Sequence, residues 1–146
     1  MDTKKNIDRL YYSAKAKRML EQIDETNYLG LGRKGITRSE LFLFAMSLGV
    51  ESRTMTEVAS PTGLVLDKSI DSTTHSLMYA QYIHTLEDVN NLDEITDRNE
   101  VYNMAEQYAN TGFEIIADYL NNTKPNDLVW DLLLELDAQY EEIRNQ

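Results

Sequence analysis

Apolar residues recur at helical spacing over most of this chain. The best specified stretch covers residues 35–50, where only Ser47 is polar between the opening turn and Gly49. An apolar surface on nearly all sides predicts a helix that is buried against several neighbours. Thr37 and Glu40 have the spacing of a capping box, which predicts the start of this helix. Gly49 is expected to end it, because glycine readily takes the left-handed conformation that follows many helices.

The part of the chain between residues 71 and 122 contains two further predicted helices. Asp71 is expected to cap the first, which extends to about Asp88. Four apolar residues of this helix share one face and are expected to be buried: Leu77, Ala80, Ile83 and Leu86. The second helix begins near Asp97 and ends at a stop signal in residues 121–125. Within it, Thr111-Gly112 indicates close packing or a kink, because glycine costs a helix about 1 kcal/mol relative to alanine.

A last helix is predicted from Asn126 or Asp127 to the C-terminus. Its apolar seam has successive spacings of 4, 3, 4 and 3 residues and consists of Val129, Leu133, Leu136, Tyr140 and Ile143. This spacing is typical of helices that pack side by side, as in a short coiled coil. We expect the seam to pack against a neighbouring helix, within the chain or across a dimer.

The first 26 residues allow two interpretations. Four apolar residues fall on one helix face, namely Ile7, Leu10, Tyr11 and Ala14, so residues 3–26 can form one amphipathic helix. Alternatively, residues 6–12 form a short strand and Ser13 caps a helix that follows it. Two adjacent tyrosines favour a strand, and the strong helix formers begin only after Ser13. The spacing favours the first interpretation, whereas the propensities and the cap favour the second.

These patterns together predict a mainly α fold. We expect about five helices in a compact bundle, with one short N-terminal strand if the second interpretation holds. Residues 1–50 form a basic N-terminal module, which is helical or strand–helix–helix. Residues 51–146 form an acidic helical bundle, and the two parts are expected to pack together as a single domain. The length of 146 residues fits one domain of ordinary size.

Charge is distributed unevenly along the chain. The formal net charge is −11. Residues 1–38 contain nine bases and five acids, a net charge of +4, whereas residues 39–146 contain five bases and twenty acids, a net charge of −15. Such asymmetry between segments suggests that the basic end has a partner of its own. The alternative is that these bases only form a solvated helix face.

Composition excludes several classes of function. The chain has no cysteine, so disulfides, thiolate metal sites and thiol nucleophiles are absent. No apolar run approaches the ~18 residues of a membrane span, and residues 1–10 contain no signal sequence, so we expect a cytoplasmic protein without membrane contact. His75 and His84, nine residues apart on one helix, lie on nearly opposite faces and cannot share a metal. We therefore predict no enzyme activity, catalytic residue, metal or cofactor.

One segment resembles a known DNA-binding family. Residues 6–50 have the order strand, Ser13 cap, helix rich in Ala and Lys, glycine turn, and a second helix opening at Gly35-Ile36-Thr37-Arg38-Ser39-Glu40-Leu41. This order resembles a ribbon-helix-helix module. The same pattern is also similar to small accessory proteins of DNA sulfur modification.

The ribbon-helix-helix resemblance implies specific roles. Such modules dimerise through paired strands, place that ribbon in the major groove, and hold a phosphate at the N-terminus of the second helix. Leu10 and Tyr12 would then face the core, while Arg9 and Tyr11, with Ile7, would face the groove. Thr37, Arg38 and Ser39 would hold the phosphate. Further contacts to the nucleic acid are expected from three bases, Lys5, Arg33 and Lys34.

The leading hypothesis from the sequence is a small, non-enzymatic, DNA-associated regulator or accessory protein that acts as a homodimer. Its basic N-terminal third would contact double-stranded DNA, and its acidic helices would contact a protein partner. The alternative is an acidic all-α adaptor or inhibitor that binds a basic protein and no nucleic acid. Salt-dependent binding to DNA would distinguish the two.

Overall fold

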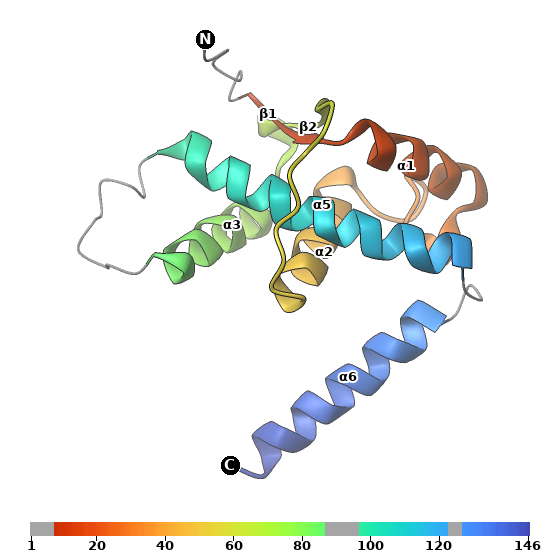
Figure 1. The fold of residues 1–146 in the computed structure, drawn as a ribbon, viewed down its shortest axis with the longest axis vertical. Helices are drawn as coiled ribbons and strands as arrows, with labels where there is room; N and C mark the ends of the chain where they lie inside the picture. Colours follow the sequence, from red (N-terminus) through yellow and green to blue (C-terminus); the bar gives the residue numbers. More distant parts are fainter. Residues whose placement is uncertain (1–7, 87–96, 123–126) are drawn as a thin grey trace.

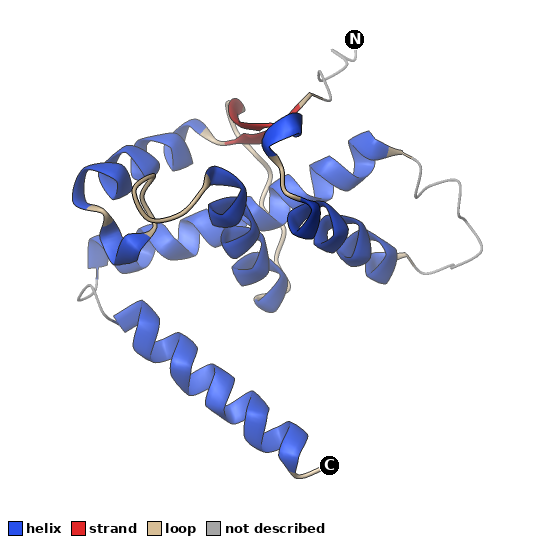
Figure 2. Cartoon of the chain, turned by 180° about the vertical axis from the view of Figure 1, so that it is seen from behind, coloured by secondary structure: helices blue, strands red, loops and turns tan. Residues whose placement is uncertain are grey.

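The computed structural model describes residues 8–86, 97–122 and 127–146 (Figure 1). In chain order its elements are β1 (Arg9–Tyr12), α1 (Ala14–Thr26), the 3-10 turn η1 (Tyr28–Gly30), α2 (Arg38–Glu51), β2 (Thr62–Leu66), the 3-10 turn η2 (Asp67–Ser69), α3 (Ser72–Thr85), α5 (Arg98–Asn122) and α6 (Asp127–Arg144). The described residues thus form five α-helices and one two-stranded antiparallel sheet (Figure 2). The predicted mainly α fold is confirmed.

The long helix α5 runs through the middle of the molecule, and α2 packs directly across it (Figure 1). The two backbones touch at two glycines. A Cβ atom on Gly112 would lie 1.7 Å from the carbonyl oxygen of Ala45, and one on Gly49 would lie 1.9 Å from that of Tyr108. The prediction of close packing at Gly112 is confirmed. The prediction that Gly49 ends α2 is wrong: the helix continues to Glu51, and Gly49 is there because no side chain fits against α5.

The strand interpretation of the N-terminus is confirmed for the described residues. Ser13 caps α1, and its hydroxyl accepts a hydrogen bond from the backbone N–H of Ala16 at 3.0 Å. β1 pairs antiparallel with β2, with Leu10 opposite Val65 and a bulge after Leu10. Leu10 and Tyr12 are buried, so the strand turns its alternate residues toward the helices. Residues 6 and 7 of the predicted strand lie outside the described residues.

The connection between α2 and β2 crosses over α5 (Figure 1) and is bonded to it. The side-chain amide of Asn110 donates to the carbonyls of Thr56 at 3.3 Å and Glu57 at 3.0 Å. The hydroxyl of Thr111 donates to the carbonyl of Thr54 at 2.8 Å. Because an extended segment cannot satisfy its own carbonyls, these two buried side chains of α5 give it a fixed path.

The predicted buried face of α3 is wrong. Leu77 and Ile83 are 45% and 41% exposed, whereas Thr74 and Met78 are fully buried. A different face of α3 is buried because the first turn of the helix is fixed to α2. Asp71 caps the helix as predicted, with Oδ1 accepting from the Thr74 backbone at 2.7 Å, and this turn is also bonded to α2. That attachment places Thr74 and Met78, one helical turn apart, against the core.

Candidate functional site

The three residues predicted to hold a phosphate have their side chains engaged within the protein. The capping box forms, with the Glu40 backbone donating to the Thr37 hydroxyl at 3.1 Å. Ser39 is only 2% exposed; its hydroxyl donates to Asp71 Oδ2 at 2.8 Å. Arg38 is largely buried and forms an ion pair with Asp24 of α1. These side chains therefore join α2 to α1 and α3.

The Arg38–Asp24 pair perturbs the carboxyl group. Burial acts to raise the pKa of Asp24, but hydrogen bonds from the Arg38 side chain and the Arg33 backbone outweigh it, so the pKa lies below its usual range. Arg33 has its Nε 3.8 Å from the same carboxylate, with a mostly exposed side chain. Lys34 is exposed beside it in the glycine-rich loop. Arg33 and Lys34 therefore remain accessible to a ligand.

Two of the residues predicted to contact DNA, Arg9 and Tyr11, lie on β1. Arg9 pairs with its neighbour Asp8, with Nε 2.8 Å from Oδ1, and this bond lowers the pKa of Asp8. The Arg9 side chain lies beside Gly63 of β2. The backbone N–H of Tyr11 donates to Glu106 of α5 at 3.3 Å. Lys5 and Ile7 lie outside the described residues.

The exposed face of α1 is basic at its N-terminal half. Lys15, Lys17 and Arg18 are exposed there, and the acids of this helix lie in its second half. These three bases form no ion pair with any residue that the structure describes. The arrangement opposes the helix dipole, because the N-terminal end carries partial positive charge and favours acids. Lys15, Lys17 and Arg18 are among the nine bases of residues 1–38, but none of the three is among the contacts predicted from the sequence.

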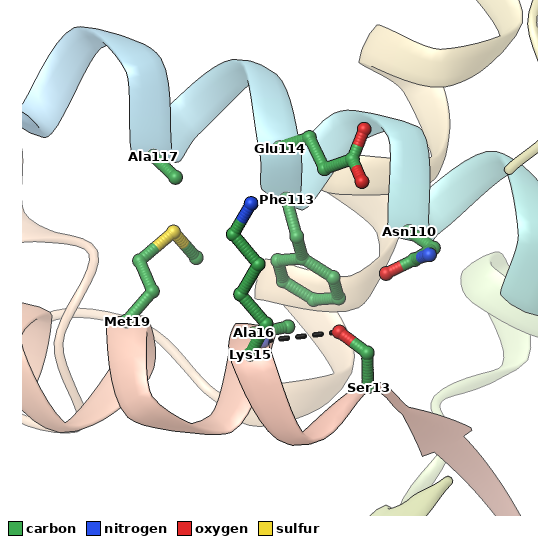
Figure 3. A pocket seen from close by; sticks show the side chains of 8 residues that line it. All are labelled: Ser13, Lys15, Ala16, Met19, Asn110, Phe113, Glu114 and Ala117. Atoms are coloured by element: carbon green, nitrogen blue, oxygen red, sulfur yellow. Dashed lines mark hydrogen bonds between the residues drawn. The ribbon is translucent and has the colours of Figure 1, made fainter. Parts of the chain in front are cut away.

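A small cavity lies between α1 and α5 (Figure 3). Its volume is about 20 Å³, enough for one water molecule. Eight side chains line it, with Lys15 and Phe113 among them. The cavity is too small for a ligand. A second, more open hollow of about 230 Å³ lies at the N-terminal end of α1, where Lys15 and Arg18 share its lining with Glu57 and Glu114.

A polar network that the sequence did not indicate joins η2, α3 and α5. Asp67 accepts from Arg98 and from the hydroxyl of Tyr102, and His75 Nε2 lies 3.7 Å from the same carboxylate. The hydrogen bond from Arg98 lowers the pKa of Asp67. Burial, followed by the bond to Asp67, raises the pKa of Tyr102 to about 12. Asp67 and Tyr102 are 35 residues apart, so no local spacing connects them.

Within the described ranges, no group of three or more His, Asp or Glu residues is arranged to hold a metal.

The last helix, α6, lies at the edge of the bundle, and Figures 1 and 2 show no other described element on its far side. Leu128 is the only residue of α6 that is buried. Seven large apolar side chains are between 40% and 68% exposed, and they are Val129, Trp130, Leu133, Leu134, Leu136, Tyr140 and Ile143. The seam predicted from the sequence is therefore not covered by any described part of the chain. We call these seven residues the α6 apolar surface.

A groove of about 230 Å³ separates α6 from the ends of α2 and α5. Leu128 and Leu132 form part of its apolar wall, and Glu51 and Glu135 approach each other across it. The hydrogen bond between these carboxyl groups raises the pKa of Glu135. Gln139 donates to Glu51 at 3.3 Å. The contact between α6 and the bundle therefore combines the buried Leu128 with a polar bond and leaves an open groove beside them.

No family model matches the chain, and neither the curated proteins nor the solved structures compared with it gave a match. In the described part of the chain, no helix is long and apolar enough to cross a membrane.

Proposed function

We propose that this chain is a cytoplasmic, non-enzymatic accessory protein that associates with double-stranded DNA as a homodimer. The observation that carries the proposal is the basic surface of α1, formed by Lys15, Lys17 and Arg18, which form no ion pair with any described residue. In a chain with 25 acids and 14 bases, three exposed bases that no described acid pairs with are available to an external anion. Their position at the positive end of the helix dipole is unfavourable for the isolated protein. A polyanion bound there would remove that penalty.

Two further exposed bases lie in the loop after α1, separated along the helix from the first three by the exposed Glu21 and Glu25. Arg33 and Lys34 follow α1 in the glycine-rich loop and can contact the phosphate backbone beyond its C-terminal end. Thr37, Arg38 and Ser39 support the surface by fixing α2 against α1 and α3. The proposed interface is thus the outer face of α1 and the following loop.

The magnitude of the expected salt effect follows from the number of contacts. Each phosphate neutralised on duplex DNA contributes about −0.9 to the slope of log K against log salt. Contact with three phosphates therefore predicts about 40-fold weaker binding at 200 mM than at 50 mM salt. A homodimer would present two such surfaces to one duplex and steepen the dependence further.

Fluorescence anisotropy of a labelled duplex at these two salt concentrations tests the proposal. Lys17→Glu should weaken binding about tenfold and reduce the salt slope by about one. Lys68→Glu is the matched control, because Lys68 is also exposed but lies in η2, outside the α1 face. Equal losses in the two variants would mean that only net charge matters, and absence of binding at 50 mM salt would refute the proposal.

The second candidate is an adaptor that binds a basic protein and no nucleic acid. It is favoured by the charge of residues 127–146, which hold six acids and one base, a net charge of −5. Under this candidate the duplex would not bind at either salt concentration. A synthetic amphipathic peptide of Lys and Leu would bind instead, and the Lys17→Glu variant would bind it as well as the unmodified protein does.

A further inference from the structure

The α6 apolar surface is too large to be left in water without a partner. Monomeric soluble proteins rarely expose a contiguous apolar patch of more than a few hundred Å². Each of the seven side chains is large and about half exposed, on the order of 100 Å² apiece. The side of α6 that faces the bundle carries Leu128 and Leu132, which line the groove and do not belong to this surface. The described bundle therefore does not cover the surface.

The geometry of the surface matches another copy of itself. Its central seam keeps the spacing 4, 3, 4, 3 from Val129 to Ile143, and an α-helix observed over this whole range presents these residues as one stripe. Two such stripes can interdigitate along their length as knobs into holes. A partner without this repeat would match only part of the stripe.

The charges beside the seam also permit self-association. The positions that flank it, which correspond to e and g of the heptad, are occupied by Trp130, Asp137 and Arg144 on one side and by Leu132 and Gln139 on the other. They therefore hold one acid and one base. The remaining acids of α6 lie away from these flanks, where repulsion between two copies is weakened by distance and by salt. A basic partner would gain little at flanks that are nearly neutral.

We infer that the α6 apolar surface binds the same surface of a second copy of this chain, so that paired α6 helices form the dimer interface. The inference rests on the homodimer of the proposed function, and it is independent of DNA binding. In a two-fold symmetric interface each residue of the surface makes its contacts in both copies, so each contact occurs twice. The five seam residues of the two copies would together cover on the order of 1,000 Å², about the minimum area that a specific interface needs.

Sedimentation equilibrium of the full chain tests this interface. The unmodified protein should be a dimer at micromolar concentration. Leu133→Asp places a charge within the seam in both copies and should raise the dimer dissociation constant roughly 100-fold or more. Ala138→Asp is the matched control, because it adds the same charge to the same helix on the side away from the seam. This control should remain a dimer.

Cross-linking gives a second test that does not depend on the stability of a variant. Because the chain has no cysteine, Leu136→Cys introduces a single thiol into the seam. Mild oxidation should convert it to a covalent dimer, whereas Ala138→Cys should form little covalent dimer although it still associates without a disulfide.

The inference is overturned if the unmodified chain sediments as a monomer, including a monomer that binds the basic peptide through α6. It is also overturned if Leu133→Asp dimerises as well as Ala138→Asp. A dimer that is lost in Leu133→Asp while the duplex still fails to bind would support the interface and refute only the DNA association.

Discussion

Replacement of Gly112 by alanine should destabilise the fold, although alanine is the better helix former. The added Cβ would lie 1.7 Å from the Ala45 carbonyl oxygen and 2.4 Å from the carbonyl carbon. Both atoms belong to the backbone of α2, so no side chain can rotate away and the two helices must separate. Overpacking of this kind costs about 3 kcal/mol, and the gain in helix propensity returns about 1 kcal/mol. The expected net loss is about 2 kcal/mol of unfolding free energy.

Urea denaturation followed by circular dichroism measures this loss. With an m-value of about 2 kcal/mol/M, the midpoint should fall by about 1 M. Gly63→Ala is the control, because its Cβ would meet only the flexible Arg9 side chain, at 3.0 Å. It should shift the midpoint little. If Gly112→Ala instead raised the midpoint, as helix propensity alone predicts, the direct backbone contact between α2 and α5 would be refuted.

Two further predictions concern polar contacts. Asp67 has a lowered pKa, so its ionised form stabilises the folded protein above the unfolded pKa of about 3.9. That stabilisation should be lost as pH falls through the lower folded pKa, and thermal denaturation between pH 6 and pH 2 should show a shallower decline for Asp67→Asn. An unchanged pH profile would contradict this role. Ser39→Ala removes a buried hydroxyl bonded to Asp71 and should cost about 1–3 kcal/mol in urea denaturation. Ser47→Ala is its control, because that hydroxyl is exposed and bonds within its own helix, and equal losses would refute the cross-helix contact.

The local signals in the sequence were reliable where one short segment determined the structure. Ser13, Thr37 and Asp71 each begin a helix as predicted, because a cap depends on only three or four successive residues. The strand at β1 was one of two open interpretations. Its partner β2 lies more than 50 residues away, so the pairing that stabilises the strand could not be read from local spacing.

Contacts between distant segments account for what sequence reasoning missed. Glycine is typical of a helix end, but position 49 is glycine because a side chain there would collide with the backbone of α5. The buried face of α3 was misjudged because the attachment of Thr74 to α2 rotates the helix. In the same way, Ser39 and Arg38 were predicted to hold a phosphate because the sequence does not reveal their partners. In the structure these partners are Asp71 and Asp24.

Anisotropy of a labelled DNA duplex is the most direct test of DNA binding by α1. We predict binding at 50 mM salt that weakens about 40-fold or more at 200 mM. Lys17→Glu should reduce this binding while Lys68→Glu retains it. Binding that is absent at 50 mM salt, or equally sensitive to both substitutions, would contradict a DNA interface on α1.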